Sequence, residues 1–285
     1  MTQVTNPTQP AISVPSGGGS NIIGIQGDNR LSAGAGNDVI QTFGGNDVIT
    51  GGGGDDIILS GGGNDSIGGG SGNDIVAAGT GNDAVAGGSG SDLIFGGKGN
   101  DVVSGDDGND LVSGDQGNDT VLGGSGNDTV FGGQGSDIVS GGDGSDSLYG
   151  GRGNDTVDGG AGNDFISGDR GSDVLTGGAG SDTFYFASPS GVDGNGLDTI
   201  TDFTPAEDKI RLKSGGAFAG LGSTFEASEF VVVSNFTASG TTAANSNKLV
   251  YDPTNGVLYF NGGTVLQVAQ LAPNLTITSN NFELF

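Results

Sequence analysis

The sequence contains no cysteine and no histidine, and these two absences exclude several kinds of site. Without cysteine no disulfide can form, and without either residue the usual ligands of zinc, copper and iron–sulfur centres are missing. The remaining metal ligands are oxygen atoms, which suit calcium or magnesium. Catalytic triads built on histidine are excluded as well, and no Gly-x-Ser-x-Gly motif occurs.

Apolar and basic residues are also scarce. Only 32% of the 285 residues are hydrophobic and 63 are glycine, so core burial is thin and we expect the chain to need a ligand for order. With 8 Lys and Arg against 34 Asp and Glu, the net charge of -26 repels nucleic acid and anionic membranes and attracts cations. No segment approaches the roughly 18 apolar residues of a membrane span.

A nine-residue repeat occupies residues 33–185 in seventeen unbroken copies. Its consensus is G-G-x-G-N-D-x-U-x, where U is a bulky apolar residue, usually Ile, Val, Leu or Phe. Every copy keeps Gly two residues before the aspartate and an apolar residue two residues after it. The repeat aspartates are Asp38, Asp47, Asp56, Asp65, Asp74, Asp83, Asp92, Asp101, Asp110, Asp119, Asp128, Asp137, Asp146, Asp155, Asp164, Asp173 and Asp182.

The repeat departs from its consensus at a few places. Gly27 to Leu31 form a degenerate copy with Asn29 at the aspartate position, which we interpret as an entry coil. Other residues replace the first or second glycine at Thr42-Phe43, Ser60, Ala78, Asp106, Asp115 and Asp169. We expect the site near Asp47 to be the most altered.

The period and the composition predict an all-β fold. Gly-rich turns alternating with three residues that have one buried centre are incompatible with a helix. Two repeats then make one 18-residue coil of a right-handed parallel β-roll, with apolar residues stacked 18 positions apart and their sequence neighbours pointing outward. Asparagine, serine or aspartate before each repeat aspartate stabilises the turn.

Calcium sites are predicted between stacked turns. Calcium takes six to eight oxygen ligands, and the repeat supplies aspartate carboxylates together with backbone carbonyls from flexible glycine turns. The two sides of the roll hold nine and eight aspartates, which gives about fifteen inter-turn sites. Stacked carboxylates repel one another without metal, so we expect folding and calcium binding to be one event.

The flanking segments differ in composition from the repeats. We predict a flexible N-terminal tail at 1–23, the roll at 24–185 and a small antiparallel β cap at 186–285, with a hairpin at Asn255-Gly256. The N-terminus lacks the basic and continuous apolar segments of a secretory signal peptide, so we expect export by another route.

Over residues 33–185 the repeat resembles the nonapeptide of the RTX (repeats-in-toxin) proteins. Asp198 to Phe203 and Asp208 to Ile210 resemble the segment that closes many RTX rolls, and Phe282 to Phe285 resembles the tail of a type I secretion signal. The resemblance implies export through the type I secretion apparatus without an N-terminal signal, to an extracellular or cell-surface location rich in calcium. The residues leave open whether Asp198, Asp202 and Asp208 are further ligands, and whether the C-terminal residues form a capping strand, a secretion signal or both.

No catalytic module is evident, so we predict that the chain is not an enzyme. We expect an extracellular structural, surface-layer or self-assembling component; a carbohydrate-binding adhesin, a monomeric calcium buffer and a hydrolase accessory module are the alternatives. The expected self-contact is an outward face more apolar than the opposite one, carrying Ile57, Leu59, Leu93, Phe95, Phe131, Tyr149 and Phe165.

Overall fold

The structure is a computed structural model that describes residues 2–3, 12–13, 18–192, 194–218, 220–221, 225–236, 247–262 and 264–285. The chain divides into two compact units, residues 1–147 and 148–285. Its regular elements are strands and short 3-10 helices, and the described part contains no α-helix. Among the described residues, no helix has the length and apolarity needed to cross a membrane.

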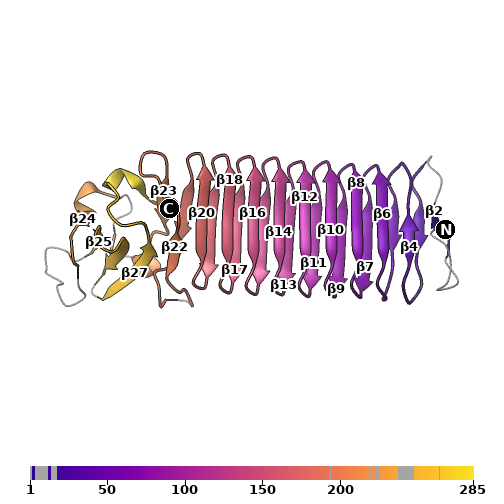
Figure 1. Cartoon of the computed structure of the whole chain (residues 1–285), viewed down its shortest axis with the longest axis horizontal. Helices are drawn as coiled ribbons and strands as arrows, with labels where there is room; N and C mark the ends of the chain where they lie inside the picture. The colour runs from indigo at the N-terminus through magenta and orange to yellow at the C-terminus, as the bar shows by residue number, and fades with distance from the viewer. Residues whose placement is uncertain are drawn as a thin grey trace. The chain divides into compact units, whose positions relative to one another are not determined.

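The first unit is a parallel β-roll in which each 18-residue coil contributes one strand to each of two sheets (Figure 1). One sheet contains β1 (Thr2–Gln3), β3 (Asn21–Ile23), β5 (Val39–Gln41), β7 (Ile57–Gly62), β9 (Ile75–Thr80), β11 (Leu93–Lys98), β13 (Leu111–Gln116) and β15 (Thr129–Gln134). The other contains β2 (Ile12–Ser13), β4 (Arg30–Ser32), β6 (Val48–Gly53), β8 (Ser66–Ser71), β10 (Ala84–Ser89), β12 (Val102–Asp107), β14 (Thr120–Ser125) and β16 (Ile138–Asp143).

The register confirms the predicted coil of two repeats. Ile58 lies opposite Ile40 on one side and opposite Val76 on the other, each 18 residues away. The apolar residue of every repeat is buried, with at most 4% of its surface exposed. These residues therefore form the narrow apolar core between the two sheets.

Most repeat strands are longer than the three residues that the sequence predicts. They run for six residues, through the first two glycine positions of the next repeat. In β7 the alternation places both Ile58 and Ser60 inside, because side chains two apart point to the same face. The first position of each turn is thus an interior position, where the consensus has glycine.

Glycine at the fourth position of the turn is required by its backbone. Gly99 has φ +133°, and a Cβ there would collide with the carbonyl oxygen of Gly81 in the preceding coil. An L side chain would therefore be both strained and sterically blocked.

The three aspartates at the second glycine position adopt a left-handed backbone. Asp106, Asp115 and Asp169 have φ of 73°, 72° and 65°, a region that Asp tolerates better than most residues. Each carboxylate accepts a hydrogen bond from the serine two residues earlier, at 2.5, 2.6 and 2.7 Å. In each Ser-Gly-Asp sequence this hydrogen bond offsets the conformational strain of placing aspartate instead of glycine at positive φ.

The N-terminal part of the chain joins the sheets earlier than predicted. Ile22 of β3 lies opposite Ile40, and the backbones of β1 and β2 pair with β3 and β4. Parts of the segment 1–23, for which the sequence predicts a flexible tail, therefore lie in these three strands. The degenerate copy behaves as expected, since Leu31 is buried and follows Asn29 into β4.

In the second unit the parallel pairing continues beyond the repeats. One sheet is ordered β17 (Ser147–Arg152), β19 (Phe165–Arg170), β21 (Thr183–Phe186), β23 (Lys209–Leu212) and β28 (Phe282–Leu284). The other is ordered β18 (Thr156–Ala161), β20 (Val174–Ala179), β22 (Asp198–Ile200), β27 (Val265–Gln270), β26 (Val257–Asn261), β25 (Lys248–Asp252) and β24 (Phe230–Val232). The described residues of this unit also include the short 3-10 helices η1 (Gly216–Phe218), η2 (Ala227–Glu229) and η5 (Ser279–Asn281).

Beyond residue 186 the sheets are partly antiparallel, as predicted, and partly parallel. β25, β26 and β27 form an antiparallel meander whose first turn contains Asn255-Gly256. Strands β23 and β28 add to the roll in parallel, and β28 covers the C-terminal residues for which the sequence leaves a capping strand open. Phe184, Phe218 and Tyr251 are among the largest fully buried side chains of this unit.

The turn geometry makes a testable prediction. We expect Gly99→Ala to lower the free energy of unfolding by more than about 1 kcal/mol, because the new Cβ meets a backbone oxygen at positive φ. Gly68→Ala is the matched control, since a Cβ on Gly68 meets no atom within 4 Å. Thermal unfolding in calcium measures both, and equal melting temperatures for the two variants would contradict this account of the turn.

Candidate calcium-binding columns

Each repeat aspartate is buried although it carries a carboxylate. Between 1% and 3% of its surface is exposed, because the glycine turn before it and the strand after it direct the side chain inward. Asp101 Oδ1 accepts a hydrogen bond of 2.8 Å from the backbone N–H of Asp83, and Asp119 Oδ1 accepts one of 2.8 Å from Asp101. The carboxylates thus stack at 18-residue intervals in two columns, one on each side of the roll.

The second carboxylate oxygen is buried without a hydrogen-bond partner in the described part of the chain. This holds for Oδ2 of Asp38, Asp47, Asp56, Asp65, Asp74, Asp83, Asp92, Asp101, Asp110, Asp119, Asp128 and Asp173. Buried polar atoms are nearly always paired, and an unpaired anionic oxygen is especially costly. A column of such atoms indicates that something other than protein satisfies them.

The space beside the first glycine of each turn is lined by oxygen. A Cβ built on Gly96 would lie 2.7 Å from Asp101 Oδ2 and 3.0 Å from the carbonyl oxygen of Gly114, which is the first glycine of the next turn. The absence of a side chain at Gly96 therefore leaves room beside a carboxylate and a carbonyl from two consecutive turns.

Burial raises the pKa of many repeat aspartates. The pKa of Asp119 rises to about 7, first because burial disfavours the charged form and then because Asp137 and Asp101 are close. The same causes raise the pKa of Asp56, Asp83, Asp92 and Asp128 to about 6. A hydrogen bond from the preceding turn opposes each shift without cancelling it. The metal-free columns are thus electrostatically unfavourable at neutral pH.

A calcium ion fits this donor set. Calcium prefers carboxylate and carbonyl oxygens and tolerates irregular geometry. No group of three acidic side chains converges in the described residues, so each site would combine two carboxylates from stacked turns with backbone carbonyls. When bound, the ion would supply the positive charge that the buried oxygens lack.

Sequence comparison agrees with this geometry. The sequence model of the family described as RTX calcium-binding nonapeptide repeat (4 copies) matches residues 23–58, 50–85, 86–121, 122–157 and 158–188, more than half of the chain. The chain belongs to this family. A search of curated proteins found no match.

Two solved structures are similar to this chain. The AlgE6R3 subunit of the Azotobacter vinelandii mannuronan C5-epimerase is 25% identical, with 58% of this chain and 77% of that chain covered and a TM-score of 0.30. The extracellular lipase LipA of Serratia marcescens is 18% identical, with 72% of this chain and 40% of that chain covered and a TM-score of 0.24. These TM-scores are too low to support a functional argument.

The three candidate ligands after the RTX repeats, Asp198, Asp202 and Asp208, occupy different positions. Asp198 extends one column, because its Oδ1 accepts the N–H of Asp173 at 3.0 Å. Asp208 closes the other column: Oδ1 accepts the N–H of Asp182, and Oδ2 accepts the N–H of Thr204. Asp202 lies outside both columns and accepts the N–H groups of Gly177 and Gly178. The sequence did not distinguish these three roles.

At the N-terminal end of the RTX columns uncharged residues take the aspartate position. The N–H of Asn29 donates to Asp47 Oδ1 at 2.6 Å, and the N–H of Ser20 donates to Asp38 Oδ1 at 2.5 Å. Asn29 Nδ2 also donates to Asp47 Oδ1, at 2.8 Å. The side-chain amide of Asn29 thus stands where other turns have a carboxylate. The backbone bond from Ser20 had no signal in the repeat pattern.

Side chains fill the first-glycine space in three successive turns of one column, at Thr42, Ser60 and Ala78. The Thr42 hydroxyl donates to the Ser60 carbonyl at 2.5 Å, and the Ser60 hydroxyl donates to the Ala78 carbonyl at 2.5 Å. These carbonyls correspond to the Gly114 carbonyl that faces the space beside Gly96. Hydroxyl groups therefore occupy acceptors that elsewhere are available to a cation.

The raised pKa values predict an unusual pH dependence for the metal-free protein. The pKa of Asp119 is about 7 when folded and near the ordinary 3.8 when unfolded, so the folded state binds protons more tightly. The metal-free roll should be most stable below pH 3.8 and lose stability as the pH rises to about 7. Circular dichroism of the chelated protein across this range measures the effect, and more β structure at neutral than at acid pH would contradict it.

Proposed function

We propose that this chain is a secreted RTX protein that folds on external calcium and serves as an extracellular structural component. The observation that carries the proposal is the pair of columns of buried carboxylates with an unpaired oxygen. Such columns are costly when metal-free and favourable when calcium is bound, so the calcium concentration outside the cell would act as the folding signal.

The proposed ligands are the repeat aspartates named above other than Asp47 and Asp65, with Asp198 as an additional one. Asp208 closes its column with both oxygens bonded and Asp202 lies apart, so neither is included. The turns of Thr42 and Ser60 are proposed to bind no ion, because their hydroxyls bond the corresponding carbonyls. One site is gained and two are lost, so we propose about fourteen ions instead of about fifteen.

The C-terminal residues support a structural role and are compatible with a secretion signal. Phe282–Leu284 form β28, the strand next to β23, and Arg211 forms a 2.9 Å salt bridge with Glu283. We propose that a type I secretion apparatus recognises this segment before the chain folds, and that the segment closes the roll after folding. The proposed location, outside the cell or at its surface, rests on this proposed secretion signal.

Exposed apolar residues support self-association. Ile57, Leu59 and Ile75 are 38–41% exposed on one face. The opposite face is less polar than the sequence suggested, since Val102 and Ile138 are 52% and 54% exposed. Leu93 and Phe95 are half-buried against their neighbours. We propose that the face predicted from the sequence is one contact between copies, and that the two faces differ less than expected.

Calcium dependence tests the central proposal. We expect Asp119→Asn to shift folding to a higher calcium concentration, because Asn keeps a hydrogen-bond acceptor for Asp101 but removes an anionic ligand. Asp143→Asn is the matched control, since Asp143 is exposed at the end of β16 and lies outside the columns. Circular dichroism against free calcium measures both. A β spectrum of the parent protein that a chelator leaves unchanged would refute calcium-driven folding.

Self-association has a separate test. The pair Leu93→Asp and Phe95→Ser should lower the mass in solution with calcium, whereas Ile138→Asp on the opposite face should lower it less. Light scattering coupled to size exclusion measures the mass. A parent protein that is already monomeric, with unchanged stability in the double variant, would favour a monomeric calcium-binding roll.

A further inference from the structure

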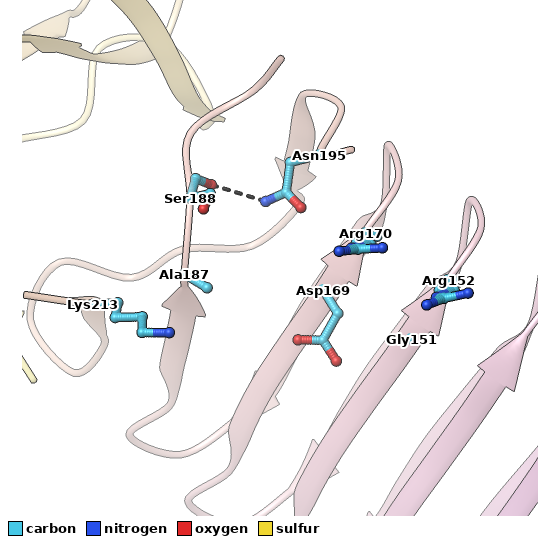
Figure 2. A pocket seen from close by; sticks show the side chains of 8 residues that line it. All are labelled: Gly151, Arg152, Asp169, Arg170, Ala187, Ser188, Asn195 and Lys213. Carbon is cyan, nitrogen blue, oxygen red and sulfur yellow. Dashed lines mark hydrogen bonds between the residues drawn. The ribbon is translucent and has the colours of Figure 1, made fainter. Parts of the chain in front are cut away.

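A basic pocket in the second unit stands apart from the acidic columns. Its volume is about 420 Å³, and Arg152, Arg170 and Lys213 line it. Figure 2 shows the two arginines at the ends of neighbouring strands and Lys213 on another segment of the pocket wall. Three of the chain's eight basic residues, all exposed, therefore line one surface pocket of a protein whose net charge is -26.

None of the three cations forms a salt bridge within the described part of the chain. The salt bridge found there joins Arg211 to Glu283, outside this pocket. The N–H of Gly153 donates to the carbonyl of Arg170 at 2.8 Å, so the two arginines lie on adjacent turns, with strands about 4.8 Å apart. Like charges on neighbouring turns repel, and an anion between them would relieve the repulsion.

The walls of the pocket are fixed by backbone and side-chain hydrogen bonds. The N–H of Lys213 donates to the carbonyl of Phe186 at 3.0 Å, which anchors the base of this side chain. Asn195 Nδ2 donates to the carbonyl of Ser188 at 2.9 Å, the bond drawn in Figure 2. Hydrogen bonds between segments that are distant in sequence thus fix the backbone from which the basic side chains extend.

One acidic residue, Asp169, also lines the pocket. Its left-handed backbone and the 2.7 Å hydrogen bond from Ser167 hold its carboxylate in place. Three cations against one carboxylate leave a local excess of positive charge. Asp169 should weaken the binding of an anion, and its removal should strengthen it.

We propose that this pocket binds the oxyanion of a small ligand, a carboxylate or a phosphate ester. Two guanidinium groups suit the paired oxygens of such groups, and the ammonium of Lys213 adds a third charge. Since the roll must be folded, the proposal rests on calcium-dependent folding, and the occupied columns would also reduce the negative field that repels anions.

The test measures binding by calorimetry to the full chain in millimolar calcium, with D-glucuronate, glucose 6-phosphate and uncharged D-glucose as probes. At least one anion should bind saturably and glucose should not. Arg152→Gln should weaken binding on the order of tenfold, the loss expected for a charge-assisted hydrogen bond. Lys98→Gln is the matched control, because Lys98 holds the same repeat position as Arg152 but lies on β11.

Asp169→Asn gives a result that a purely structural role would not. Asn tolerates the left-handed backbone and still accepts the Ser167 hydroxyl, so the fold should persist while anion affinity rises about fivefold. Circular dichroism in the same buffer separates loss of folding from loss of binding. Absence of saturable anion binding to a protein that is folded, or equal losses in Arg152→Gln and Lys98→Gln, would overturn the proposal and leave calcium-driven folding untouched.

Discussion

The structure depends on one electrostatic constraint: the repeat carboxylates are buried with one oxygen paired to the preceding turn, and in turns such as that of Asp101 the other oxygen is left for a cation. The backbone N–H of the preceding turn satisfies Oδ1, as in the bond from Asp83 to Asp101, and this fixes the direction of the carboxylate. Oδ2 then faces the space that the first glycine leaves open. Glycine content, acidity and the thin apolar core all follow, because the chain replaces apolar burial with metal ligation.

The repeat made much of this predictable from the sequence. Strict spacing gave the coil length, the stacked residues such as Ile40 and Ile58, and the aspartate columns. The two ends of the roll were harder to predict, because their strands join the sheets by backbone pairing and do not follow the repeat sequence. At the N-terminal end, Ile22 lies in β3 although no repeat surrounds it. At the C-terminal end, Asp198 extends a column whereas Asp202 accepts hydrogen bonds from a glycine turn, and the sequence around them does not separate the two roles.

Other features depend on contacts that the repeat does not encode. The basic pocket unites Arg152, Arg170 and Lys213 from three segments, and no local motif signals that they meet. The hydroxyl bonds of Thr42 and Ser60 are similar: the sequence shows missing glycines, but only the register shows that each hydroxyl reaches the carbonyl of the next turn.

The most direct measurement of the central claim is anomalous diffraction from crystals grown in calcium. The account predicts two rows of calcium peaks between stacked turns, each beside an aspartate Oδ2 and a first-position carbonyl such as that of Gly114. It also predicts no peak beside Thr42 or Ser60. An ordered roll without peaks in the columns, or with calcium bound only at surface carboxylates, would contradict it.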